Sequence, residues 1–209
     1  MSESFDPAVF AEAAEQLARW GRWIYERGWS PATSSNYSMR LSAEACAITT
    51  SGRDKGLLSA EHIMAVDLAG LPLGPGKPSA ETLLHTQLYK HFPAVGAVLH
   101  THSVAATVLS LAIGAGQEVV LEGYELAKAL PGVTDHQTPV RVPVVANHQD
   151  MTVLGAAADA AIARVPHCSA YLICGHGLYA WGASLEQVRH QVEALEFLFS
   201  CALSARTLR

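Results

Sequence analysis

The sequence has little of several features that would point to particular classes of protein. Only 16% of its 209 residues are charged, and 14 lysines and arginines stand against 19 aspartates and glutamates, a formal charge of -5. Nucleic-acid binding relies on clustered positive charge, so this balance argues against a nucleic-acid partner. Half of the residues are hydrophobic, which suits a packed core and excludes a disordered chain. We expect a single domain over residues 1–209.

Long uninterrupted apolar runs are also missing. The most apolar stretches, residues 104–113 and 155–165, are broken by polar residues and are shorter than the roughly 18 residues that a membrane span needs. We therefore expect no membrane partner. The first residues lack the basic start and apolar run of a secretory signal, so the expected compartment is the cytoplasm.

Cysteine is scarce and unpatterned. The four cysteines form no CxxC pair and are far apart in the sequence, so neither a disulfide framework nor a cysteine-rich metal site is indicated. Each is expected to be a small packed side chain.

Helical and strand-like segments alternate along the chain, which predicts an α/β fold with a mixed sheet. Asp6 and Pro7 form a helix start, and Gly28 ends that helix. Further helices are expected over Ala80–Phe92, Val104–Ile113, Leu121–Leu130, from Asp150 through Val165, and from Ser184 to Ala202. Strands are expected over Met39–Leu41, Ala47–Thr50, Val95–Leu99 and Val140–Val145, with a strand pair inside Ser169–Trp181 around His176.

Two histidines separated by one residue carry the strongest chemical signal. His100 and His102 follow a predicted strand directly, and alternate side chains on extended backbone share a face. A third histidine, His176, lies between two glycines at another strand-like segment. Three neutral imidazoles suit zinc and leave a coordination position open for substrate.

The competing interpretation is that these histidines are ordinary strand-end residues bonded to the backbone. For the other seven, solvated side chains are the expectation, and no ligand role is assigned to His62, His85, His91, His136, His148, His167 or His190. Cys174 would share a strand face with His176, but a thiolate would reduce the effective charge of the metal, so it is expected to pack.

A loop at residues 49–56 offers hydroxyls, a flexible glycine and the cations Arg53 and Lys55. Such a set suits a phosphate or carboxylate group. The alternative is that both cations are simply solvated.

Three blocks carry a family resemblance, namely Lys77–Glu81, the strand into His100–Ser103, and Cys174–Gly182. In this order they resemble the signature blocks of the class II aldolase and adducin-head superfamily, over nearly the whole chain. Within it, Pro31–Ser38, Pro78–Thr82 and Gly123–Lys128 look most like the methylthioribulose-1-phosphate dehydratases of methionine salvage.

The resemblance implies a three-layer α/β/α sandwich with a mainly antiparallel sheet, one zinc ion per subunit on His100, His102 and His176, and a homo-oligomer, commonly a tetramer. It implies that the substrate is a small phosphosugar. The residues that correspond to the family's phosphate-binding loops are Thr33, Asn36, Ser38, Ser51, Gly52 and Ser79, with Lys55 as a possible addition. Ser35 replaces a glycine that is usual in the family, which puts a side chain where the phosphate would approach the backbone.

The implied reaction is loss of water from a 2-ketose 1-phosphate. The metal would stabilise the negative charge left when C3 loses its proton, and hydroxide would leave from C4. A carboxylic acid must protonate that hydroxide. Glu125 matches the catalytic glutamate of the dehydratase pattern and is favoured, on the expectation that burial raises its pKa. Glu81 matches the acid of the aldolases and is the alternative, either as acid or beside a metal ligand.

Two other functions stay open. A metal-dependent aldolase or pentulose-phosphate epimerase would use the same histidines with Glu81 as its main acid. An adducin-head-like interaction module would keep the fold without chemistry, but it has no need for all three histidines.

Overall fold

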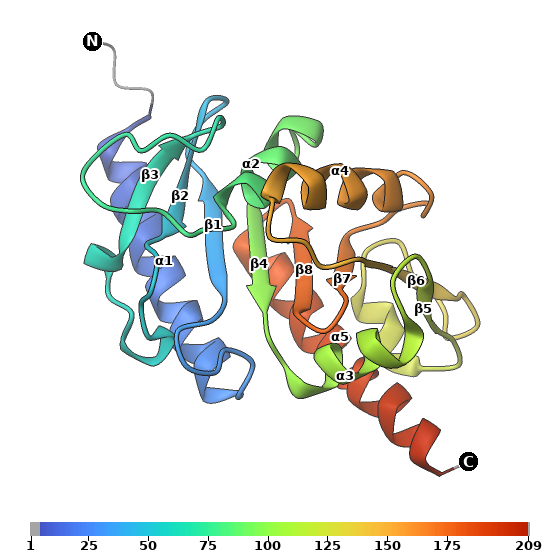
Figure 1. Cartoon of the computed structure of the whole chain (residues 1–209). Coiled ribbons are helices and arrows are strands. Elements are labelled where there is room, and N and C mark those ends of the chain that lie inside the picture. Colours follow the sequence, from blue (N-terminus) through green and yellow to red (C-terminus); the bar gives the residue numbers. More distant parts are fainter. Residues whose placement is uncertain (1–4, 209) are drawn as a thin grey trace. The chain divides into compact units, whose positions relative to one another are not determined.

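The computed structural model describes residues 5–208, which form two compact units (Figure 1). The first unit contains the chain up to Thr101 together with Trp181–Leu185, and the second contains His102–Ala180 and the chain from Glu186 onward. Five α-helices and eight strands lie within the described residues. The expectation of a single domain over 1–209 stays a prediction.

The first unit is built on four strands in the order β3-β2-β1-β4, each antiparallel to its neighbour. These strands are β1 (Asn36–Arg40), β2 (Ala45–Thr49), β3 (Ile63–Asp67) and β4 (Ala97–Thr101). Two α-helices of this unit are α1 (Pro7–Glu26) and α2 (Thr82–His91), and short 3-10 turns lie at Lys55–Leu57 and Ala60–His62. The Asp6 side chain accepts a hydrogen bond from the Ala8 amide and caps α1, as predicted.

Helices cover both faces of β1. Tyr37 lies against Gly21 of α1, where an added Cβ would collide with its ring. The next residue, Ser38, points to the opposite side because side chains alternate along a strand, and its hydroxyl bonds His85 and Tyr89 of α2. The first unit is therefore three layers deep at this strand, as expected for an α/β/α sandwich.

The second unit has strands in the order β8-β7-β6-β5. They are β5 (Glu118–Leu121), β6 (Val140–Val145), β7 (Ala170–Ile173) and β8 (Gly177–Gly182), the last two residues of which belong to the first unit. β5 pairs antiparallel with β6, and β8 pairs antiparallel with β7, whereas β6 and β7 pair in parallel. The expected mixed, mainly antiparallel sheet is thus confirmed.

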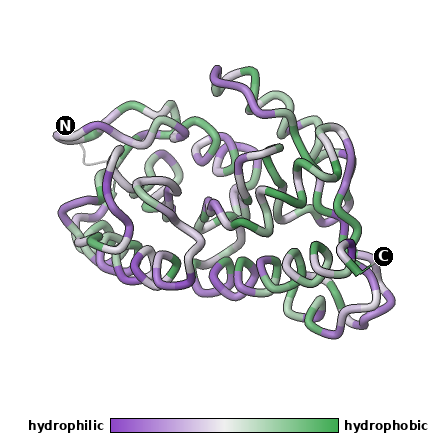
Figure 2. Tube along the Cα trace, turned by 60° about the horizontal axis from the view of Figure 1, so that its bottom comes forward, coloured by the Kyte–Doolittle hydropathy of each residue, from purple (hydrophilic) through white to green (hydrophobic). Residues whose placement is uncertain are grey.

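Three helices belong to the second unit: α3 (Val104–Ile113), α4 (Met151–Ile162) and α5 (Leu185–Thr207), the last from Glu186 onward. α3 packs on β5 and β7, and α4 packs on β6. The Gln191 side chain of α5 donates to the Ser169 carbonyl, 2.9 Å away, just before β7. Figure 2 shows hydrophilic and hydrophobic residues on the same helices, as amphipathic packing requires.

Most predicted elements are confirmed, with ends shifted by a few residues. α3 and β6 have the predicted bounds, and Asp150 caps α4 as expected. The helix predicted over Leu121–Leu130 is wrong: Leu121 ends β5, and only a 3-10 segment, Glu125–Ala129, follows. Gly123 lies between them with φ of 82°, a left-handed conformation that interrupts an α-helix.

No helix among residues 5–208 is long and apolar enough to cross a membrane. All four cysteines, which lie in this described part of the chain, are free thiols. Cys46 is buried, as predicted, whereas the other three are half-buried.

Candidate metal and phosphosugar site

His102 and His176 lie together in the second unit. Their ring centroids are 4.6 Å apart. His102 comes just before Ser103, whose hydroxyl accepts from the Ala106 amide and caps α3. The position of His102 is therefore set by the start of that helix.

The tight turn between β7 and β8 carries His176. Its amide donates to the Ile173 carbonyl at 3.0 Å, and Gly175 adopts φ of 66°, which favours glycine. α3 also holds this turn, because the Thr107 hydroxyl donates to the His176 carbonyl and the Ser110 hydroxyl accepts from the Gly175 amide. The small residues around His176 thus serve the turn that presents its ring.

His100 lies in the first unit, fully buried on β4 and opposite Asn36 of β1. Its Nε2 atom is 3.2 Å from a carboxylate oxygen of Glu81, at the start of α2. The same oxygen accepts a hydrogen bond of 2.8 Å from the Asn36 side-chain amide. Glu81 is therefore held beside a predicted metal ligand.

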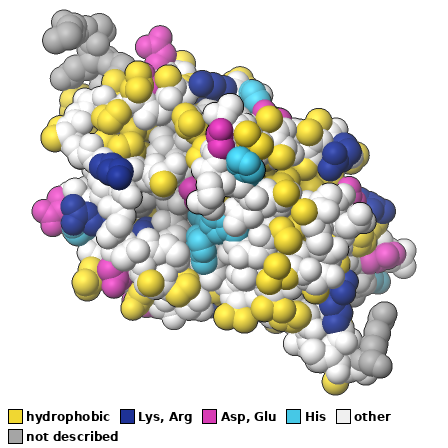
Figure 3. Space-filling view, in the orientation of Figure 1, with side chains coloured by type: hydrophobic (Ala, Val, Ile, Leu, Met, Phe, Trp, Pro, Cys, Tyr) yellow, Lys and Arg dark blue, Asp and Glu magenta, His cyan; other side chains and the backbone are white. Residues whose placement is uncertain are grey.

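The three histidines form a group that could hold a metal ion. His100, His102 and His176 each offer one ring nitrogen, and these atoms lie within 4.8 Å of one another. Figure 3 shows histidine side chains at several separate places on one face of the molecule. A donor set of three neutral imidazoles fits a divalent transition metal such as zinc. Cys174 is outside this group, and its thiol lies 3.6 Å from the Ser110 carbonyl oxygen.

A buried chain of hydrogen bonds runs behind Glu81 in the first unit. The Asn36 side-chain oxygen lies 2.5 Å from Nε2 of His85, Nδ1 of His85 lies 2.7 Å from the Ser38 hydroxyl, and that hydroxyl lies 2.8 Å from the Tyr89 hydroxyl. Burial lowers the pKa of His85 to about 4, opposed in part by the Glu81 charge.

The expectation that His85 is a solvated surface residue is wrong, because its side chain is fully buried. A signal was present in the sequence. Glu81, His85 and Tyr89 are spaced four residues apart at the start and along the predicted helix, and such residues share one helix face.

The predicted phosphate-binding residues come from loops of the first unit and, for Asn36 and Ser38, from β1. Thr50 bridges to Pro78, the Ser51 amide donates to the Lys77 carbonyl, and the Ser79 amide donates to the Thr49 carbonyl. The two segments therefore run antiparallel side by side, with Ser51 opposite Lys77 and Ser79 opposite Thr49. Thr33, Ser51 and Gly52 are exposed, Ser79 is half-buried, and Asn36 and Ser38 are buried.

Lys55 is buried, whereas the sequence left a solvated side chain open as one alternative for it. Only 1% of the residue is exposed, and its ammonium group donates to the carbonyl oxygens of Thr33 at 3.1 Å and Arg53 at 2.8 Å. Burial lowers its pKa to about 8. Lys55 therefore ties the loop that carries Thr33 to the loop that carries Gly52.

Ser35, which stands where the family usually has glycine, has φ of 71°. This left-handed backbone explains a preference for glycine at this position. The serine hydroxyl lies 3.4 Å from the Trp29 carbonyl oxygen.

Glu125 lies in the second unit on the exposed 3-10 segment. Its side chain is 71% exposed, pairs with Lys128, and lies 3.8 Å from a ring nitrogen of His136. The Lys128 hydrogen bond lowers its pKa. The expectation that burial raises the pKa of Glu125 is therefore wrong in this chain, and its catalytic role stays a prediction.

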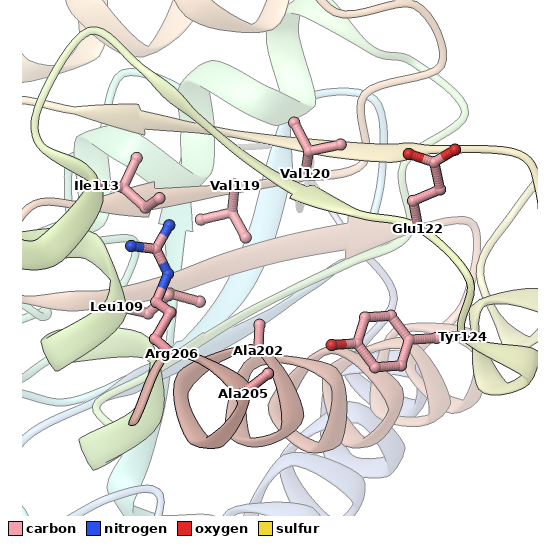
Figure 4. A pocket seen from close by; sticks show the side chains of 9 residues that line it. All are labelled: Leu109, Ile113, Val119, Val120, Glu122, Tyr124, Ala202, Ala205 and Arg206. Atoms are coloured by element: carbon pink, nitrogen blue, oxygen red, sulfur yellow. The ribbon is translucent and has the colours of Figure 1, made fainter. Parts of the chain in front are cut away.

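A cavity of about 640 Å³ lies elsewhere in the second unit (Figure 4). Its wall is mostly apolar, and three polar side chains join it: Glu122, Tyr124 and Arg206. None of the predicted site residues lines it.

Known proteins resemble this chain in sequence over almost its full length. The family model described as "Class II Aldolase and Adducin N-terminal domain" matches residues 15–203. A methylthioribulose-1-phosphate dehydratase of Pseudomonas aeruginosa (strain LESB58) is 53% identical over 198 residues, which cover 94% of this chain and 96% of the relative. The protein of that name from Marinobacter nauticus is 52% identical over 206 residues, covering 98% and 99%.

Solved structures give the same fold. YgbL of Klebsiella pneumoniae superposes with a TM-score of 0.78 at 27% identity, covering 93% of this chain and 90% of the other. L-fuculose-1-phosphate aldolase of Thermus thermophilus gives a TM-score of 0.73 at 24% identity, covering 94% and 98%. The predicted class II aldolase-like fold is confirmed.

Proposed function

The chain belongs to the class II aldolase and adducin N-terminal domain family, and on this premise we propose that it is a methylthioribulose-1-phosphate dehydratase of methionine salvage. The proposed reaction converts 5-methylthioribulose 1-phosphate to 5-methylthio-2,3-dioxopentyl 1-phosphate and water. The single observation that carries the proposal, beside relatives of that name at 53% identity, is the group of three histidines with Glu81 next to His100.

In this proposal His100, His102 and His176 hold one zinc ion per subunit. A bound zinc ion supplies a Lewis acid that stabilises negative charge on substrate oxygens. Glu81 lies 3.2 Å from Nε2 of His100, which supports this role because it places a carboxylate beside the proposed ligands.

Water elimination requires a group that takes the C3 proton and a group that protonates the hydroxide leaving C4. We assign these two tasks to Glu81 and Glu125. Glu81 lies beside a metal-ligand histidine, which supports proton transfer close to the reacting carbons. Glu125 is assigned from the family pattern Gly123–Lys128, and to act as an acid it has to give up its pairing with Lys128.

The phosphate group is proposed to bind the loops around Thr33, Ser51, Gly52 and Ser79. The hydroxyls of Thr33, Ser51 and Ser79 are suitable donors to phosphate oxygens, whereas the Ser51 and Ser79 amides already donate to backbone carbonyls. Asn36, Ser38 and Lys55 are engaged in buried hydrogen bonds, so their contribution is proposed to be the shape of the loops.

The second candidate is a class II sugar-phosphate aldolase or pentulose-phosphate epimerase. The exposure of Glu125 and its pairing with Lys128 favour it, because an aldolase would rely on Glu81 as its main acid. A non-catalytic interaction module is the weakest candidate, since it does not require three clustered histidines.

The chain is further proposed to assemble as a homo-oligomer, with a tetramer favoured by the family resemblance. An apolar row on α3 supports self-association, because Val104, Val108 and Leu111 share a helix face and are 75%, 41% and 61% exposed. Four free thiols suit a reducing compartment such as the cytoplasm.

The deciding experiment compares turnover of synthetic methylthioribulose 1-phosphate with that of fuculose and ribulose phosphates, with zinc measured in each preparation. We expect turnover of the thioether sugar only, with one zinc per chain. Cleavage or epimerisation of the other sugars would favour the second candidate, and an inactive protein without metal would favour the interaction module.

The carboxylate assignment is tested with Glu81→Gln and Glu125→Gln. Each substitution is expected to retain zinc and to lower kcat by about 10²- to 10⁴-fold, as expected for loss of a general acid or base. A variant with unchanged kcat would remove that residue from the mechanism.

A further inference from the structure

The donor and the acceptor can be assigned for each hydrogen bond in the chain that runs from Glu81 to Tyr89. An ionised carboxylate only accepts hydrogen bonds, so the Asn36 amide must turn its NH₂ group toward Glu81. This leaves the Asn36 oxygen facing Nε2 of His85, and that nitrogen must carry the proton and donate it.

The hydrogen bonds at the other ring nitrogen of His85, Nδ1, are assigned by the same reasoning. A neutral imidazole that is protonated on Nε2 accepts on Nδ1, so the Ser38 hydroxyl donates to Nδ1. The Ser38 oxygen then accepts from the Tyr89 hydroxyl. The low pKa of His85 agrees with a ring that stays neutral.

We propose that His85 is a positioning residue for Glu81, acting through Asn36. Its Nε2–H holds the Asn36 oxygen, so the amide cannot turn over and present that oxygen to the carboxylate. If the amide turned over, two acceptors would face each other without a proton between them, and the carboxylate of Glu81 would lose its donor. The catalytic consequence rests on the proposed function, whereas the hydrogen-bond arrangement does not.

The kinetic test uses two substitutions of His85 and one matched control. His85→Phe keeps an aromatic ring but has no donor for Asn36, and it is expected to lower kcat by about 100-fold, the effect of a small misplacement of a catalytic group. KM and zinc content should change little. His85→Gln offers an amide NH₂ near the position of Nε2 and should recover most of kcat.

The control is Thr86→Val, which removes a buried hydroxyl from the next residue of α2, outside this hydrogen-bond chain. It should lower the melting temperature without lowering kcat. If kcat falls with the melting temperature in all three variants alike, His85 is merely structural and the proposal is overturned. If His85→Phe does not fold, His85→Asn replaces it, since its shorter amide cannot reach Asn36.

A second measurement requires no substrate. Imidazole ¹⁵N NMR of the wild type near neutral pH should show the His85 ring protonated on Nε2 and unprotonated on Nδ1, with His85→Gln identifying the signals. The opposite tautomer or a charged ring would overturn the proposal. Failure of the wild type to turn over methylthioribulose 1-phosphate would overturn the proposed function and leave this arrangement standing.

Discussion

At the scale of single residues, a buried cation shapes the loops proposed to bind phosphate. The Lys55 ammonium lies under two loop carbonyls, and burial outweighs the opposing charge of Asp54 in setting its pKa near 8. A buried charge costs free energy unless hydrogen bonds compensate it. The two carbonyls supply that compensation, and because both bind the same ammonium group, Lys55 connects the two loops.

We expect the stability of the protein to depend on pH through the titration of Lys55. Because its folded pKa is lower than the unfolded value, the unfolded chain binds more protons between pH 8 and about 10.4, and the contribution of Lys55 to stability rises with pH in that window. Urea unfolding of the wild type and Lys55→Met between pH 7 and 10.5 measures it. The wild type should gain stability relative to the variant above pH 8, and a difference independent of pH would contradict the assignment.

Residue identity alone predicted part of the site. The spacing of His100 and His102 and the glycines around His176 pointed to the cluster that forms. The burial of His85 was missed although its four-residue spacing from Glu81 and Tyr89 marks one helix face. The burial of Lys55 was missed because a loop has no periodic pattern that shows which side is covered. The exposure of Glu125 was missed for a related reason: the glycine at 123 diverts the chain before a helix can bury that side chain.

At the scale of elements, close backbone approach fixes how β4 begins. Gly96 donates to the Gly182 carbonyl and accepts from the Arg40 amide, both at 2.8 Å. A Cβ at this position would collide with the backbone carbonyl of Ala183. β4 carries His100, so its start requires glycine on steric grounds.

Gly96→Ala is therefore expected to destabilise the protein by about 1–3 kcal/mol, the usual cost of overpacking. Gly74→Ala is the matched control, because nothing lies within 4 Å of an added Cβ there. Urea unfolding of both variants against the wild type checks the difference. Equal stability of Gly96→Ala and Gly74→Ala would show that the strand can shift to accept the methyl group.

Element boundaries were predicted best where caps and breakers are explicit. Asp6 with Pro7 and the capping Asp150 set their helix starts within a residue. The strand around Val95 was displaced toward His100, because backbone pairing with β1 rather than local composition decides where it begins.

At the scale of the whole molecule, the apolar row on α3 is one exposed surface that self-association would cover. Val104 is the first residue of α3 and is 75% exposed. An aspartate at the first position of a helix interacts favourably with the helix dipole, so Val104→Asp should keep α3 folded while placing a charge in an apolar contact.

We expect Val104→Asp to shift the protein from oligomer toward monomer in analytical ultracentrifugation, with an unchanged circular dichroism spectrum. Leu71→Asp, at a site 62% exposed in a loop of the first unit, is the control and should leave assembly unchanged. A monomeric wild type would refute self-association outright, and an unaffected variant would remove this row from the interface.

Helix α3 positions two proposed metal ligands, His102 and His176. The capped start of α3 follows His102, and within the first turn of the same helix Thr107 anchors the carbonyl of His176. Any displacement of α3 would therefore move both rings in the same direction and largely preserve their separation. The distance between these two rings is therefore less sensitive to small shifts of α3 than it would be if two independent elements held them.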